Sequence, residues 1–128
     1  MNVVDSSAWL EYFADGPNAG DFARAIERTT ELLVPSLTLY EVWKRVVEQR
    51  GEGAALQAIA LMQRGRIVDL DARLAVSAAR ASLEHRLPMA DSVILATARA
   101  HHATLWTQDA DFDGLLGVEY RKHKKPGK

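Results

Sequence analysis

The chain has 128 residues and no cysteine, with 48% hydrophobic and 26% charged residues, the usual balance of a globular domain. This length predicts one domain, and the absence of cysteine excludes disulfide frameworks, thiolate zinc sites and cysteine nucleophiles. The formal net charge is −1, but residues 121–128 contain five of the 16 Lys and Arg residues and none of the 17 acids. We therefore divide the chain into a domain at residues 1–120, with a net charge of 11 − 17 = −6, and a basic tail at residues 121–128.

The first half of the chain alternates strand and helix patterns. Residues 2–4 form a short apolar run that predicts a strand, and two helical patterns follow it, one closing at residues 15–17 and one spanning residues 20–28. A second strand at residues 31–35 stops at its proline. Helices from residue 36 and over residues 54–63 are separated by a Gly-Glu-Gly sequence, which predicts a helical hairpin.

The second half repeats the alternation. A third strand at residues 66–70 precedes helices over residues 72–87 and 89–102. A fourth strand at residues 103–107, a helical turn near residues 111–116 and a weak fifth strand at residues 118–120 complete the pattern. Strands alternating with helices predict an α/β layered fold around a mainly parallel sheet. No apolar run approaches the length of a membrane span and acids interrupt the N-terminus, so we expect a cytoplasmic protein without a signal peptide.

Four acids occupy comparable places in these elements. Asp5 and Asp109 come just after predicted strands, and Glu41 and Asp91 lie in the first turns of predicted helices. Taken singly, each has a structural explanation: Asp5 or Asp91 as a helix cap, Glu41 as the partner of Thr38 in a capping box, and Asp109 as the start of a turn. Their shared position at the edge where strands end and helices begin favours one common crevice.

Helical periodicity predicts different surroundings for Asp91 and Glu41. Asp91 shares an apolar helix face with Ile94 and Leu95, where a solvated surface acid is out of place. Glu41 lies nearly opposite the apolar arc of its own helix, so periodicity alone leaves it open to solvent. Converging carboxylates require raised pKa values or a compensating cation. Oxygen ligands without cysteine or paired histidine favour Mg²⁺ or Mn²⁺, which can neutralise charge on a phosphodiester and activate water.

Four sequence segments resemble, in order, the motifs of the PIN-domain family, and they are most similar to VapC-type toxins of toxin–antitoxin pairs. The segments are residues 3–8 (VVDSSA), 37–42 (LTLYEV), 87–96 (LPMADSVILA) and 105–112 (LWTQDADF). The resemblance implies a three-layer α/β/α sandwich and a Mg²⁺- or Mn²⁺-dependent endoribonuclease. It also implies an RNA substrate, a cognate antitoxin protein and a homodimer.

The resemblance assigns roles to particular residues. Asp5, Glu41, Asp91 and Asp109 match the family's acidic quartet, and Asp111 is a weaker metal ligand. Ser6 and Thr107 match small hydroxyl residues that support the acids. From its position one turn beyond Glu41, the Lys44–Arg45 pair is a candidate RNA contact, although a solvated helix face explains it equally well.

Other functions remain open to test. A phosphoacceptor domain is disfavoured because Ser7 stands where a haloacid-dehalogenase-type protein needs a second Asp, and no Lys follows Trp106 until Lys122. A non-catalytic module whose acidic edge binds a basic partner protein remains the alternative. The near-helical spacing of Trp9, Tyr12 and Phe13 predicts a helix face that packs in the core, or that forms an interface. As an interface, which a small domain would not fully bury, this face favours a homodimer.

Overall fold

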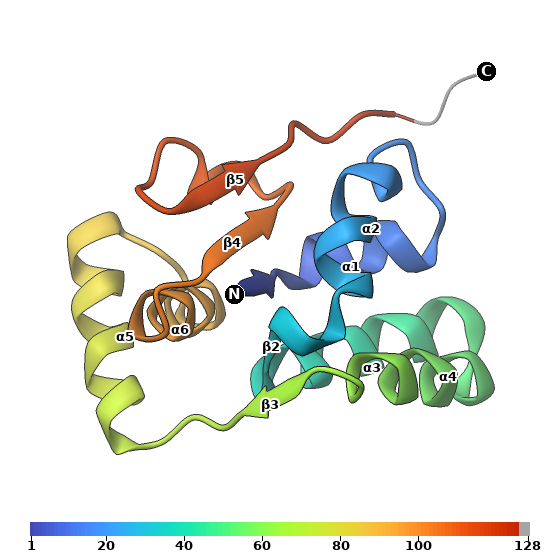
Figure 1. The fold of residues 1–128 in the computed structure, drawn as a ribbon, viewed down its shortest axis with the longest axis horizontal. Coiled ribbons are helices and arrows are strands. Elements are labelled where there is room, and N and C mark those ends of the chain that lie inside the picture. Colours follow the sequence, from blue (N-terminus) through green and yellow to red (C-terminus); the bar gives the residue numbers. More distant parts are fainter. Residues whose placement is uncertain (126–128) are drawn as a thin grey trace.

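The computed structural model describes residues 1–125 as five strands, six α-helices and two short 3₁₀ turns (Figure 1). The last three residues of the predicted basic tail lie outside the described residues. In chain order the elements are β1 (Asn2–Val4), α1 (Ser6–Phe13), α2 (Ala19–Glu27), η1 (Thr29–Glu31), β2 (Leu32–Pro35), α3 (Ser36–Arg50), α4 (Glu52–Met62), β3 (Arg66–Val68), α5 (Ala72–His85), α6 (Met89–Ala100), β4 (Thr104–Thr107), η2 (Ala110–Phe112) and β5 (Val118–Tyr120).

The predicted elements are confirmed, and the differences lie at their ends. Glu31 belongs to the 3₁₀ turn before β2 rather than to the strand. The helix predicted over residues 72–87 ends at His85, because Arg86 adopts the left-handed conformation (φ 56°) and its N–H closes the last turn onto the Ser82 carbonyl. The turn predicted near residues 111–116 is the shorter η2. Within residues 1–125, no helix is long and apolar enough to cross a membrane.

All strand pairs in the sheet are parallel, in the order β3-β2-β1-β4-β5. The chain builds outward from β1 to β2 and β3, and then crosses back to place β4 on the other side of β1. The carboxyl ends of β1 and β4 therefore flank the point where the strand order reverses. In open parallel sheets, ligands bind in the crevice at this point.

Helices cover both faces of the sheet, which makes three layers (Figure 1). Alternate strand residues point to opposite faces, as the strand period requires. Val4, Leu32 and Val34 pack against α1 to α4, whereas Val3, Leu33 and Leu105 pack against α5, α6 and η2. The predicted α/β/α sandwich is confirmed: the central strands are buried on both sides, whereas the edge strands β3 and β5 are partly exposed.

Candidate metal centre

Asp5 joins the sheet to α1 and faces the end of β4. Its backbone N–H donates to the Trp106 carbonyl (2.9 Å), which continues the pairing of β1 with β4. Its Oδ2 accepts from the Ser7 hydroxyl (2.7 Å), the Thr107 hydroxyl (2.9 Å) and, at 3.4 Å, the Ser7 backbone N–H. Asp5 is therefore both the N-cap of α1 and a buried, tightly oriented carboxylate.

Glu41 is held by a residue from another element. The Ser6 hydroxyl donates to Glu41 Oε1 at 2.6 Å and ties α3 to the start of α1. The predicted capping box between Thr38 and Glu41 does not form, because Thr38 is fully buried and its hydroxyl donates to the Pro35 carbonyl instead (2.7 Å). Helical periodicity allowed Glu41 to be fully exposed to solvent. In the structure its side chain is half-buried.

Asp91 lies in the first turn of α6 but does not cap it. The N-cap position is Pro88, which has no side-chain acceptor, so the cap interpretation of Asp91 is wrong. The side chain is half-buried on the face that carries the buried Ile94 and Leu95. Because this face of α6 packs against the sheet, the Asp91 carboxylate lies near the carboxyl ends of the strands.

Asp109 and Asp111 follow β4 and complete the cluster. The Asp109 N–H donates to the Thr107 hydroxyl, and the Asp111 N–H donates to Asp109 Oδ1, both at 2.9 Å. This second bond caps η2, so Asp109 also opens a turn. One carboxylate oxygen from each of Asp91, Asp109 and Asp111 lies within 4.8 Å of the other two. Asp111 thus stands among the three closest acids.

The pKa values of two of these acids, Asp5 and Asp91, are raised. Burial has the largest effect on Asp5 and raises the pKa of its carboxyl above 3.8; hydrogen bonds from Ser7 and Thr107 oppose the rise, while the charges of Asp109 and Glu41 add to it. Burial likewise raises the pKa of Asp91 to about 7, with further contributions from the negative charges of Asp5, Asp109, Glu41 and Asp111. Asp91 is therefore within reach of the charges of all four other acids.

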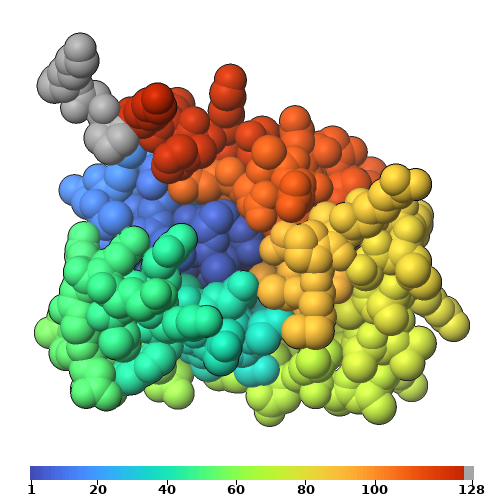
Figure 2. Space-filling model, turned by 180° about the vertical axis from the view of Figure 1, so that it is seen from behind, coloured from blue at the N-terminus to red at the C-terminus, as the bar shows by residue number. Residues whose placement is uncertain are grey.

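Within residues 1–125, no Lys, Arg or His forms an ion pair with any of the five acids. A carboxylate cluster without an internal cation is the setting in which a hard divalent ion binds, because it neutralises several like charges at once. In Figure 2 the dark blue start of the chain is seen inside a hollow between the teal start of α3, the gold α6 and the orange segment from β4 to η2. This hollow lies at the reversal of strand order.

Comparison with known proteins gives the family. The model of the PIN domain matches residues 3–115. The chain belongs to the PIN-domain family. No curated protein sequence matches the chain.

Solved structures share the fold of this PIN domain. A toxin–antitoxin complex from Klebsiella pneumoniae is 22% identical, with a TM-score of 0.78, and the match covers 93% of this chain and 96% of that one. Mycobacterium tuberculosis VapC20, described as a sarcin–ricin loop cleaving toxin, is 22% identical (TM-score 0.75; 92% and 98% covered). VapBC2 from Rickettsia felis, bound to a promoter DNA fragment, is 16% identical (TM-score 0.72; 93% and 97% covered).

The two predicted RNA contacts lie beside Glu41 on the surface of this PIN domain. Lys44 and Arg45 are exposed on α3 and, together with Tyr40, Glu41 and Glu48, line an open depression of about 220 Å³. The Lys44 ammonium lies 5.9 Å from the centroid of the Tyr40 ring. The depression shares Glu41 with the acidic cluster, so both cations border the candidate metal centre.

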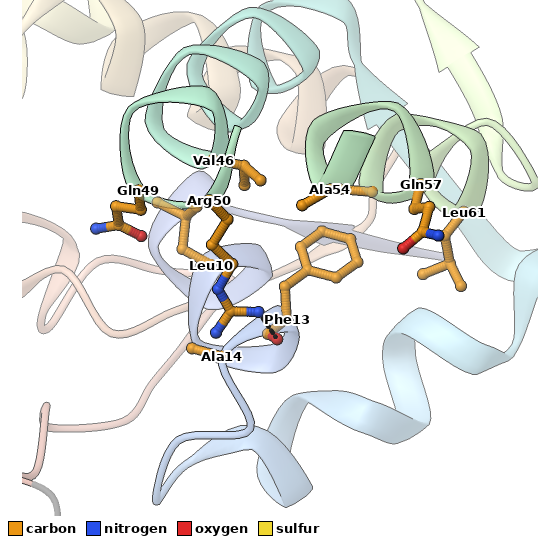
Figure 3. A pocket seen from close by; sticks show the side chains of 10 residues that line it. Leu10, Phe13, Ala14, Val46, Gln49, Arg50, Ala54, Gln57 and Leu61 are labelled. Carbon is orange, nitrogen blue, oxygen red and sulfur yellow. Dashed lines mark hydrogen bonds between the residues drawn. The ribbon is translucent and has the colours of Figure 1, made fainter. Parts of the chain in front are cut away.

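A second depression lies apart from the acids (Figure 3). It has a volume of about 260 Å³ and lies between α1, α3 and α4. In Figure 3, the Arg50 side chain reaches toward the Phe13 carbonyl, to which it donates at 3.5 Å. No acid of the cluster lines it. The aromatic face of α1 belongs mainly to the core: Trp9 is fully buried, and the half-buried Tyr12 and Phe13 pack against the same cluster.

Three residues near the centre were not singled out as site residues by the sequence. Ser7 donates to Asp5, and its oxygen accepts from the Gln108 N–H (3.2 Å). Gln108 in turn accepts from the side chain of Asn18 (3.0 Å). A Ser two residues after a capping Asp was an available signal for Ser7. Asn18 had none, because it reaches Gln108 across 90 residues of sequence.

Proposed function

We propose that this PIN domain is a Mg²⁺- or Mn²⁺-dependent endoribonuclease that acts as the toxin of a toxin–antitoxin pair. The observation that carries the proposal is the cluster of Asp91, Asp109 and Asp111 carboxylates, with ligand atoms within 4.8 Å of one another. Asp5 and Glu41 face the same cluster, and no internal cation compensates it within residues 1–125.

The donor set fits a hard divalent ion. Five carboxylates without sulfur or histidine ligands favour Mg²⁺ or Mn²⁺, which usually completes its coordination with water and phosphate oxygens. The residues that would hold it are Asp5, Glu41, Asp91, Asp109 and Asp111. When bound, the ion supplies charge neutralisation at the phosphodiester and lowers the pKa of a water.

The remaining residues orient these acids. Ser6 fixes one oxygen of Glu41, and Ser7 and Thr107 both donate to Asp5 Oδ2, which leaves its Oδ1 without a hydrogen bond within residues 1–125. Fixed carboxylates lose little conformational freedom on binding a cation or substrate, so these hydroxyls preorganise the centre. Asp91, with its raised pKa, holds a proton at low pH that it must release to act as a ligand.

The RNA substrate and the protein partner are supported by the relatives. One structure with this fold is a toxin described as cleaving the sarcin–ricin loop, and another is a toxin–antitoxin complex. By extension, we assign to this chain an RNA substrate contacted by Lys44 and Arg45, a cognate antitoxin and a cytoplasmic site of action. Growth arrest on expression, relieved by the product of an adjacent gene, is the expected cellular result.

Cleavage of an RNA panel by the purified protein tests the nuclease proposal. Cleavage should require Mg²⁺ or Mn²⁺, stop with EDTA and be abolished by Asp5→Asn, which keeps the size of the side chain but removes its charge. Asp69→Asn is the matched control, because Asp69 also follows a strand of the sheet but is exposed and outside the cluster. Equal cleavage with EDTA contradicts the proposal. Binding of a basic peptide without any cleavage of RNA favours a non-catalytic acidic-edge module instead.

A further inference from the structure

We propose that residues 121–125 form an arm that binds the phosphate backbone of RNA, and that the buried side chain of Asn18 holds this arm beside the acidic cluster. The inference rests on the proposed nuclease function and deepens it. It names the part of the molecule that attracts a polyanion to an acidic site.

The arm begins at a residue that also organises the acids. After β5 ends at Tyr120, the Arg121 N–H still donates to the Thr107 carbonyl (2.9 Å). The hydroxyl of the same Thr107 donates to Asp5 and accepts from the Asp109 N–H, both at 2.9 Å. The first residue of the arm is therefore joined through one residue to two acids of the cluster.

Asn18 fixes the next residue of the arm. Its side chain is 1% exposed, and its amide nitrogen donates to the Lys122 carbonyl (2.9 Å) and to Gln108 Oε1 (3.0 Å). Its own backbone N–H donates to the buried Glu11 carboxylate (2.7 Å), which holds the loop between α1 and α2 in place. A buried amide N–H left without an acceptor is destabilising, so these bonds restrict the path of the chain at Lys122.

The charges of the arm divide into two groups. Arg121 is engaged by the protein itself: it pairs with Glu119 (3.1 Å) and Asp21 (4.0 Å), and it lies 5.5 Å from the centroid of the Trp106 ring. The side chains of Lys122, Lys124 and Lys125 are exposed and form no ion pair within residues 1–125. Three lysines thus remain available to an external anion.

The charge balance of the molecule favours a phosphate chain as that anion. Residues 1–120 carry a net charge of −6, so the body repels RNA at long range and the arm supplies the opposing attraction. In Figure 2 the red segment near the end of the chain lies against the lighter blue segment between α1 and α2, near the hollow that contains the dark blue start of the chain. A strand of RNA entering this hollow would pass the arm.

The test is the salt dependence of RNA binding. The probe is a labelled single-stranded RNA of mixed sequence, and the full chain carries Asp5→Asn so that the probe stays intact. Replacing Lys122, Lys124 and Lys125 together by Gln should weaken binding. It should also make the slope of log Kd against log salt shallower by about 0.7 per lost phosphate contact, or about 2 in all.

A matched control removes the same charge elsewhere. Arg64, Arg66 and Arg99 are exposed and lie near the opposite edge of the sheet, where β3 begins and α6 ends. Their joint replacement by Gln should leave the slope unchanged. A further variant, Asn18→Ala, keeps every charge but releases the arm. In the Asp5→Asn background it should weaken RNA binding and make the salt slope shallower, whereas a merely structural role would lower the fraction of folded protein and leave the slope unchanged.

Each outcome decides the inference. If the lysine variant and the arginine variant bind RNA with the same affinity and the same salt slope, while the wild type still cleaves RNA, the proposed role of the arm is wrong and the nuclease proposal stands. If the lysine variant with native Asp5 cleaves faster than the wild type, the arm covers its own acids and the inference is also overturned. If the wild type neither binds nor cleaves RNA, both proposals fail.

Discussion

Hydroxyl side chains and mutual repulsion determine the state of each acid in the cluster. Glu41 and Asp5 receive hydroxyl donors from Ser6, Ser7 and Thr107. No donor to the Asp91 carboxylate is found within residues 1–125, and this side chain is surrounded by negative charge. Burial and this repulsion therefore raise the pKa of Asp91 without an opposing hydrogen bond.

The pH dependence of stability follows from the raised pKa of Asp91. Its pKa is about 7 in the folded protein against 3.8 ordinarily, so the folded state binds more protons between these values. The metal-free protein should lose stability as pH rises through this range. Asp91→Asn removes this loss, so in EDTA its gain in melting temperature should be larger near pH 8 than near pH 5.

The same variant distinguishes a metal ligand from a residue with only a structural role. Mn²⁺ should raise the melting temperature of the wild type more than that of Asp91→Asn, because a ligand that binds only the folded state stabilises by mass action. Asp69→Asn serves as the control and should keep the full Mn²⁺ shift. A variant that is destabilised at both pH values and keeps its Mn²⁺ response would contradict the ligand role of Asp91.

The connection between α1 and α2 shows how an element boundary supports the cluster. Glu11 is buried at the end of α1, and its carboxylate accepts from the Asn18 N–H at the start of α2. A Cβ at Gly16 would lie 2.3 Å from Glu11 Oε1. The missing side chain at Gly16 thus makes room for a buried carboxylate that anchors Asn18.

Two glycine substitutions near this connection should have opposite effects. Gly16→Ala should destabilise the protein by about 1–3 kcal/mol, because it displaces Glu11 from its hydrogen bond in a buried position. Gly20→Ala should stabilise it by about 0.4–1 kcal/mol, because Gly20 lies in α2 with open space around its Cβ. Urea unfolding measures both. Equal stability of the two variants would show that Glu11 moves aside without cost.

The whole molecule covers both faces of its sheet, and its exposed large apolar side chains lie on helices α3 to α6 and, outside the helices, at Met1, Leu70 and Leu116. Trp9 is fully buried, so the aromatic face of α1 gives less support to a homodimer than its sequence indicated. On α5, Val76 and Leu83 are 56% and 84% exposed and lie seven residues apart, on one side of the helix. The predicted homodimer thus has a more suitable apolar face on α5.

Light scattering tests the homodimer prediction. The wild type should have the mass of two chains at high concentration, and Leu83→Glu should shift it to one chain without loss of fold, because this side chain makes little contact with its own domain. Leu56→Glu is the control on α4, where the side chain is 61% exposed. A wild type that remains monomeric at every concentration would contradict the prediction.

Most of the fold could be predicted because its signals are local. Strand runs such as residues 2–4, the proline that ends β2 and the apolar faces of α3 and α6 depend on neighbouring residues alone. The ends of the elements were less predictable. The left-handed Arg86 that ends α5 is not marked by a glycine; its conformation lets the Leu87 N–H donate to the Ser82 carbonyl (3.3 Å), a contact that residue type alone does not indicate.

The sequence by itself determined the layered fold, the acids at the ends of strands and helices, and the preference of these oxygens for a hard cation. These properties follow from residue type and from the period of short segments. Only the tertiary structure decided that Glu41 bonds Ser6 rather than Thr38, that Asp111 joins the closest acids, and that Asn18 holds Lys122. These contacts join residues 20 to more than 100 positions apart, and the crossover that returns β4 to the side of β1 brings most of them together. Local periodicity contains no information on such distances.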